Sequence, residues 1–325
     1  YQTLILIDFF NYILKYLCIA ATNTLIQLQY ILIWIYFTFD FSLQILYNYY
    51  SLQLTDLLCR KELIFMIKLI ATDIDGTLVN DEKQLPPDFT DIIDILDKKG
   101  ISFAVSSGRS YSALIDQFSF IAEKISFICD NGSYIVDKGE IISRSVIPQK
   151  AVHEILKTCY ENGLCPLLCG ENGTYYSSKS VEYEQEVARY YNNTVYMEKL
   201  YDCRDNIFKI AIYGKDGIET NGLPVLNSRF GSNLTVSLSG YYWVDIMNPG
   251  INKGRGIQIL QNKLGASYEE TMAFGDYLND IEMLEHAYYS FAMENAHPMV
   301  KKTANFSTGT NNEFSVTKEI SRLIK

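Results

Sequence analysis

Short apolar runs that end at polar clusters alternate with amphipathic segments along most of the chain. Short, mostly apolar runs predict buried strands at residues 67–71, 101–105, 126–129 and 271–274. Amphipathic spacing predicts a helix after Pro86-Pro87 that Gly100 closes, and another at 256–264 that Gly265 closes. Strands that are apolar on both faces are typical of parallel sheets covered by helices. The pattern therefore predicts an α/β fold around a parallel sheet.

Residues 148–247 have a pattern of their own. Helices are predicted at 151–160 and 181–191, and strands at 164–168, 174–177, 207–213, 234–238 and 242–247. We expect an α+β domain here, inserted into a first domain made of 66–147 and 248–325. Lys209 falls in one of these strands. It either meets a substrate anion or is a solvated surface charge, which is commoner for a lone lysine.

The first 65 residues differ from the rest, because they are crowded with Tyr, Leu, Ile and Phe and contain no proline. The segment 16–39 carries no charged side chain, yet polar residues interrupt it, and a spanning helix needs about 20 mostly apolar residues. One interpretation is a membrane anchor or interfacial segment. The other, which we favour, is that 1–65 is not part of the working protein, since Met66 directly precedes the first predicted strand.

Two carboxylates follow the first predicted strand, in Asp73-Ile74-Asp75-Gly76-Thr77-Leu78. Ligands of open α/β sheets bind just beyond the carboxyl ends of the strands. An extended backbone would aim Asp73 and Asp75 the same way, so that one can attack while the other moves protons. Gly76 permits a sharp turn and a close approach of backbone N–H groups to a ligand.

Further polar clusters stand at the other strand ends and at one helix start. They are Ser106-Ser107-Gly108-Arg109, Asp130-Asn131-Gly132, Lys253 and Gly275-Asp276-Tyr277-Leu278-Asn279-Asp280. Several of these residues have a structural alternative. Ser-Gly and Asn-Gly are ordinary turn sequences, Arg109 faces either substrate or the surface, and Asp280 suits a helix cap. A capping role does not account for Asp276.

Taken in order, the clusters that contain Asp73, Ser107, Lys253 and Asp276 resemble the first, second, third and fourth motifs of the haloacid dehalogenase (HAD) superfamily, in its Cof-type phosphatase branch. The resemblance extends from Met66 to about Ile324. The resemblance implies a Rossmann-like parallel-sheet core with an inserted α+β cap that closes over the site and selects the substrate. Glu294 and Phe314-Ser315 depart from the family pattern, which often has glycine and Asp-Gly there. These departures lie outside the motifs and affect only loop geometry.

The resemblance also implies roles for the residues. Asp73 is the nucleophile and Asp75 the general acid and base. Phosphate contacts come from Gly76, Ser107, Lys253 and Asn279, with Arg109 and Asn131 lining the site. Mg²⁺ is the implied cofactor. Its ligands are Asp73, the backbone carbonyl of Asp75, Asp276 and Asp280.

The expected function is therefore a Mg²⁺-dependent phosphatase that acts on small phosphomonoesters (sugar phosphates, nucleotides or phosphorylated cofactors) through an aspartyl-phosphate. One alternative is a phosphomutase of the same superfamily, although the longer glycine-rich insertion of phosphomannomutases is absent from 275–280. Ion-pumping ATPases also form an aspartyl-phosphate, but in them the second acid of this motif is replaced. The presence of Asp75 therefore argues against that class. A non-catalytic phosphate-binding module remains a different class, opposed by the intact Asp73 and Lys253.

Composition narrows the choice of partners. The formal charge of −10 and the pI near 4.9 argue against a nucleic-acid binder, and they require local cations wherever a phosphate binds. The seven cysteines form no regular framework, which favours reduced thiols in a cytoplasmic protein. His153, His286 and His297 fit no Ser-His-Asp pattern. A membrane partner is expected only if 1–65 is a real anchor, and no pattern indicates an oligomeric state.

Overall fold

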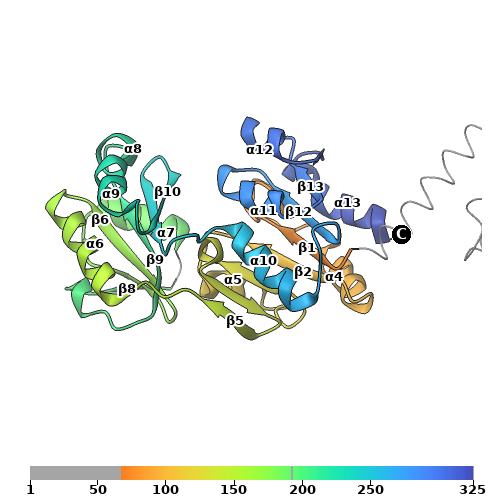
Figure 1. Ribbon diagram of the computed structural model, residues 1–325, viewed down its shortest axis with the longest axis horizontal. Helices are drawn as coiled ribbons and strands as arrows, with labels where there is room; N and C mark the ends of the chain where they lie inside the picture. The colour runs from red at the N-terminus through yellow and green to blue at the C-terminus, as the bar shows by residue number, and fades with distance from the viewer. Residues whose placement is uncertain (1–66, 192, 325) are drawn as a thin grey trace, which may run out of the picture. The chain divides into compact units, whose positions relative to one another are not determined.

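The computed structural model describes residues 67–191 and 193–324 (Figure 1). The segment 1–65 lies outside this part, so both interpretations of it stay predictions. None of the helices in the described ranges has the length and apolar character to cross a membrane.

The larger sheet has the strand order β14-β13-β12-β1-β2-β3-β4-β5, in which only the pairs that β4 makes with β3 and β5 are antiparallel. Its strands are β1 (Leu69–Thr72), β2 (Ser102–Ser106), β3 (Ser126–Cys129), β4 (Tyr134–Asp137), β5 (Glu140–Arg144), β12 (Thr271–Gly275), β13 (Tyr289–Ala292) and β14 (Phe306–Ser307). The four predicted apolar strands are confirmed as β1, β2, β3 and β12. They lie next to one another, so their polar ends meet at one edge.

Helices contribute buried apolar side chains to the core of this sheet. They are α4 (Phe89–Lys98), α5 (Tyr111–Phe118), α10 (Lys253–Leu264), α11 (Ile281–Glu285), α12 (Pro298–Thr303) and α13 (Ser315–Ile324). In α4, Phe89, Ile92 and Leu96 recur at helical spacing and are all buried. The helix predicted at 256–264 begins three residues earlier, at Lys253, because the Asn252 side chain caps its first turn.

The smaller sheet has the order β10-β11-β9-β6-β7-β8 and is antiparallel except for β7 with β8. Its strands are β6 (Cys165–Gly170), β7 (Thr174–Tyr176), β8 (Thr194–Tyr196), β9 (Ile207–Tyr213), β10 (Thr235–Gly240) and β11 (Trp243–Met247). Its helices are α6 (Gln149–Glu161), α7 (Val181–Tyr190), α8 (Ile218–Asn221) and α9 (Leu223–Phe230). This is the expected α+β cap, and its boundaries at 148 and 247 remain a prediction.

Alternate residues of β9 serve the two faces of the cap sheet. Ile210 and Ile212 belong to the apolar cluster that α6 and α9 cover, whereas Ala211 and Tyr213 belong to a cluster with residues of α7. Lys209 has the same parity as Ala211, so it belongs to the α7 face. This face also bears Asp245 from the neighbouring strand β11, whose partner across the pair is Ala211.

Candidate active site

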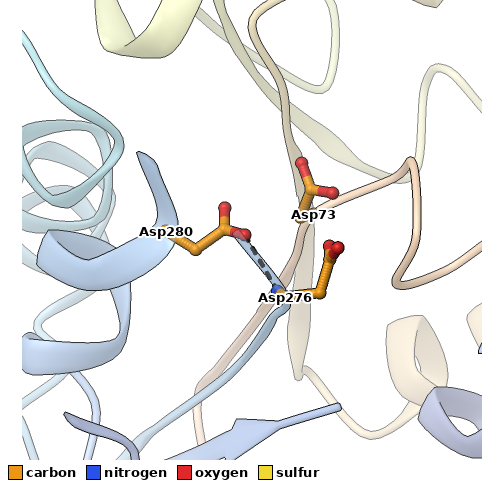
Figure 2. Close-up of side chains that lie close together, drawn as sticks. All are labelled: Asp73, Asp276 and Asp280. Carbon is orange, nitrogen blue, oxygen red and sulfur yellow. Dashed lines mark hydrogen bonds between the residues drawn. The ribbon is translucent and has the colours of Figure 1, made fainter. Parts of the chain in front are cut away.

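Strand pairing places the first two carboxylates together. Asp73 directly follows β1 and Asp276 directly follows β12, the parallel neighbour of β1. The backbone N–H of Asp73 continues the ladder by donating to the carbonyl of Phe274 at 3.0 Å. With Asp280 from the next turn, these residues offer carboxylate oxygens that all lie within 4.8 Å of one another (Figure 2). The structure thus brings together three of the four predicted metal ligands through their side chains.

Asp280 uses its two carboxylate oxygens for different purposes. Its Oδ2 accepts hydrogen bonds from the backbone N–H groups of Asp276 and Tyr277, each at 3.0 Å, and the first of these is drawn in Figure 2. Its Oδ1 accepts from Lys253 Nζ at 2.6 Å. The Asp280 side chain makes no capping hydrogen bond to the helix that begins at Ile281, so the capping alternative is wrong. One oxygen instead closes the turn that precedes this helix, and the other contacts Lys253.

Lys253 lies at the start of α10 and is 1% exposed. Its ammonium contacts Asp73 Oδ1 at 2.5 Å and Asp280 Oδ1 at 2.6 Å. Burial would lower the pKa of Lys253, but the charges of Asp280 and Asp73 outweigh it and raise the pKa. The lysine is thus a fixed buried cation that joins the first and fourth motifs.

Burial is the main influence on the pKa values of Asp73 and Asp276. It raises the pKa of Asp73 well above its usual range, with Lys253 opposing and Asp280 and Asp276 adding to the shift. Burial likewise raises the pKa of Asp276 to about 6, although the Thr77 hydroxyl donates to its Oδ1 at 2.7 Å. A cluster of carboxylate oxygens short of positive charge fits a hard divalent cation such as Mg²⁺, which takes oxygen ligands.

Gly76 is required by the packing against Asp276. Its φ of +80° lies in the left-handed region, and a Cβ at this position would stand 2.5 Å from Asp276 Oδ2. The Gly76 backbone therefore packs closely against a carboxylate of the fourth motif, and its predicted approach to a ligand stays a prediction.

The structure corrects the expectation for Asp75. Strand β1 ends at Thr72 and the chain turns from Ile74, so the extended backbone assumed for 73–75 is not continued. Arg109 Nη2 donates hydrogen bonds to both carboxylate oxygens of Asp75, at 2.7 Å to Oδ1 and 2.6 Å to Oδ2. Lys83 Nζ donates to Oδ1 at 2.8 Å. Burial opposes ionisation of this acid, yet Arg109 and Lys83 outweigh it and lower its pKa. Arg109 is thus neither a free surface group nor a free substrate contact.

The remaining predicted residues form a connected set. Ser107 is buried, and its Oγ accepts from the backbone N–H of Arg109 at 3.2 Å. The side-chain amide of Asn279 donates to Asn131 Oδ1 at 3.2 Å. Asp130 and Asn131 have φ of +47° and +53°, a left-handed conformation that Asp and Asn tolerate better than other non-glycine residues.

A second buried charge cluster was missed. Lys209 is 2% exposed, so the solvated-surface interpretation is wrong. Its ammonium donates to the Gly108 carbonyl at 2.7 Å and lies 3.5 Å from Asp245 and 3.6 Å from Asp130. A signal was available, because Lys209 and Asp245 each interrupt an otherwise apolar strand and carry opposite charges. Paired charges are the usual way to bury such residues.

Comparison with known proteins shows the family of the chain. Residues 70–320 match the haloacid dehalogenase-like hydrolase family. The 5-amino-6-(5-phospho-D-ribitylamino)uracil phosphatase YbjI of Escherichia coli K12 is 31% identical over 262 residues, which cover 80% of this chain and 97% of YbjI. The phosphatase of the same name from Bacillus subtilis, YcsE, is 29% identical and covers 78% of this chain and 94% of its own.

Solved structures of similar sequence have a similar fold. A crystal structure of SMU.1108c from Streptococcus mutans is 28% identical with a TM-score of 0.73, covering 78% of this chain and 98% of its own. The HAD subclass IIB sugar phosphatase BT4131 is 26% identical with a TM-score of 0.68, covering 79% of this chain and 100% of its own.

The chain belongs to the haloacid dehalogenase-like hydrolase family. The predicted family, the Rossmann-like core with an inserted α+β cap, and the expectation of a hydrolase acting on phosphoric monoester bonds are therefore confirmed. The roles of individual site residues remain predictions.

Proposed function

We propose that the protein is a Mg²⁺-dependent phosphatase that hydrolyses small phosphomonoesters through an aspartyl-phosphate on Asp73. The observation that carries this proposal is the set of buried Asp73, Asp280 and Lys253 with partly buried Asp276 at the carboxyl edge of the parallel sheet. Three carboxylates this close to one another, with one lysine that contacts only Asp73 and Asp280, are costly unless they bind something positively charged.

Asp73, Asp276 and Asp280 would hold Mg²⁺, with the backbone carbonyl of Asp75 as a further expected ligand. The bound ion would neutralise charge on the phosphate and on the attacking carboxylate. Lys253 keeps an ammonium against Asp73 Oδ1, which orients this carboxylate and reduces its repulsion of an incoming phosphate dianion.

The reaction would take place in two steps. A carboxylate oxygen of Asp73 forms a bond to phosphorus while the bond to the leaving oxygen breaks, and Asp75 gives that oxygen a proton. Water then attacks the phosphorus, Asp75 takes its proton, and Asp73 is released with inorganic phosphate. Because Arg109 and Lys83 lower the pKa of Asp75, this residue becomes a proton donor only once its contact with Arg109 has loosened.

Ser107, Lys253, Asn279 and the backbone near Gly76 would bind the non-bridging phosphate oxygens. Asn131 orients the Asn279 amide, since its Oδ1 accepts one of the amide protons at 3.2 Å. Arg109, released from Asp75, would be available to the substrate.

The substrate would be a small molecule, chosen by the cap. Two curated relatives are named as phosphatases of a ribitylaminouracil phosphate, and a solved relative is named as a sugar phosphatase. Phosphorylated polyols and sugars, including that uracil derivative, are therefore the first compounds to test, followed by nucleotides. We place this activity in the cytoplasm.

The test is phosphate release from this panel by the full chain, with and without Mg²⁺, for the wild type and Asp73→Asn. We expect Mg²⁺-dependent turnover that Asp73→Asn abolishes. Asp91→Asn, the same substitution at an exposed position of α4, should leave it unchanged. Turnover that persists in Asp73→Asn would contradict the aspartyl-phosphate route. Phosphate transfer within a sugar would indicate a mutase, and phosphate binding without turnover a binding module.

A further inference from the structure

The strongest unexplained contact joins the cap to the second motif. The Lys209 ammonium, carried by the cap strand β9, donates a hydrogen bond to the carbonyl of Gly108 at 2.7 Å. Gly108 lies between Ser107 and Arg109, two predicted site residues. Lys209 itself touches neither the three carboxylates at the strand ends nor Lys253 in the described part of the chain.

The peptide group between Gly108 and Arg109 links Lys209 to Ser107. Its carbonyl accepts from Lys209, and its N–H donates to Ser107 Oγ at 3.2 Å. A hydroxyl has one proton to donate and two lone pairs that accept. Because the peptide N–H occupies a lone pair, the Ser107 proton remains available, and within the ranges the structure describes it has no acceptor at hydrogen-bond distance. A phosphate oxygen is the acceptor that suits it.

We propose that Lys209 is a positioning residue: by holding the Gly108–Arg109 peptide, it keeps the Ser107 hydroxyl oriented to donate to a phosphate oxygen. This inference rests on the proposed function, since it assigns a purpose to a cap residue in the same site. It makes the phosphate-binding geometry of the core depend on a side chain from the cap.

The distances argue against a purely charge-balancing lysine. Lys209 lies 0.8 Å or more closer to the neutral Gly108 carbonyl, at 2.7 Å, than to Asp245 at 3.5 Å or Asp130 at 3.6 Å. Asp130 Oδ1 is buried and has no hydrogen-bond partner in the described ranges. A lysine that only neutralised these acids would be expected at 2.7–2.9 Å from one of them.

Neighbouring contacts hold the start of β9 against this loop. Ser133 donates to the carbonyl of Phe208 at 3.2 Å, and the rings of Tyr134 and Phe208 stack at 4.8 Å. From the same face of the cap, Asp245 lies 3.5 Å from the side-chain amide of Asn131. The backbone N–H groups of Asp130 and Asn131 donate to the carbonyls of Arg109 and Ser107. Lys209 thus acts on a loop that is already fixed on its other side.

The test is a double-mutant cycle on the full chain, in which calorimetry with Mg²⁺ measures the binding of inorganic phosphate. Lys209→Met should weaken binding about 10-fold, the size of one hydrogen bond to a charged group. Ser107→Ala should weaken it by a similar factor, and adding Lys209→Met to Ser107→Ala should change it little. Independent, multiplying effects would overturn the proposal. So would a wild-type affinity in Lys209→Met.

Two controls separate positioning from general destabilisation. Lys209→Met combined with Asp130→Asn removes one charge of each sign, so it restores the charge balance of the cluster without restoring the bond to Gly108. It should fold and still bind phosphate weakly, whereas recovered affinity would overturn the proposal. Lys215→Met, at an exposed cap lysine paired with Glu182, should bind like the wild type.

Failure of the proposed function has a different outcome. A wild type that binds phosphate but turns over no substrate contradicts the phosphatase assignment and leaves the cycle measurable. A wild type that binds no phosphate at all overturns both proposals.

Discussion

Replacing Asp130 by asparagine should stabilise the protein, and the gain should grow with pH. The Asp130 side chain is 1% exposed at the end of β3, and its Oδ1 has no hydrogen-bond partner within the described residues. Burial raises its pKa to about 6, with Lys209 opposing and Asp245 adding to the shift. The carboxylate form is therefore disfavoured in the folded protein.

The direction of the pH dependence follows from the number of protons that the folded and unfolded states bind. In the unfolded chain Asp130 should titrate near pH 4, about two units lower than in the folded chain. Between about pH 4 and pH 6 the folded state binds more protons, so this residue's contribution to the free energy of unfolding falls as pH rises. Above pH 6 the loss is complete, at about 3 kcal/mol. Asparagine does not titrate and tolerates the φ of +47°.

Urea denaturation of the wild type and Asp130→Asn at a series of pH values measures this effect. The stability difference in favour of the variant should rise from near zero at about pH 4 to between about 1 and 3 kcal/mol at about pH 8. Other acids titrate in both proteins and cancel in the difference. Asp116→Asn, at an exposed position of α5, should show no such rise. A difference that is flat with pH, or that favours the wild type at pH 8, would refute the reasoning.

Other perturbations test the carboxylate site. Gly76→Ala should lower the free energy of unfolding by about 1–2 kcal/mol and weaken Mg²⁺ binding in a calorimetric titration, because the φ of +80° strains alanine and the new methyl displaces Asp276. Lys253→Met should cost about 3–5 kcal/mol by urea denaturation, since it leaves two buried carboxylates unpaired. Mg²⁺ should raise the thermal midpoint of the wild type but not of Asp276→Asn. Because burial raises the pKa of Asp276 to about 6, protons should compete with Mg²⁺ below that pH and weaken its binding. An unchanged Mg²⁺ affinity at pH 5 would contradict this.

The site was predictable where its chemistry is local in sequence. Asp73 and Asp276 each end a strand, and parallel pairing of β1 with β12 brings their ends together without further information. The left-handed turn at Gly76 follows from its sequence position, and the structure adds that the glycine packs against Asp276, whereas its approach to a ligand stays a prediction. The apolar runs at 67–71 and 271–274 were sufficient to place these residues.

Side-chain pairing between distant segments was not predictable in the same way. Arg109 was expected to face either substrate or surface. It instead forms an ion pair with Asp75, which is 34 positions away in sequence. Lys209 and Gly108 are 101 positions apart, one in a strand of the cap sheet and the other in the loop after β2 of the larger sheet. Strand patterns indicate which face a side chain lies on, but they do not indicate which loop of another sheet will meet it.

The negative net charge of the chain repels phosphate, so phosphate binding depends on the charges within the site. The site contains four carboxylates, those of the predicted nucleophile Asp73 and of Asp75, Asp276 and Asp280, and three cations, Lys83, Arg109 and Lys253. If all are ionised, the site has one excess negative charge and repels a phosphate dianion. One divalent cation reverses that sign. The raised pKa values of Asp73 and Asp276, which arise mainly from burial, reflect the same shortage of positive charge. In the proposed mechanism, Mg²⁺ therefore binds before phosphate. The acidic site accepts a phosphate anion only after the cation has made its net charge positive.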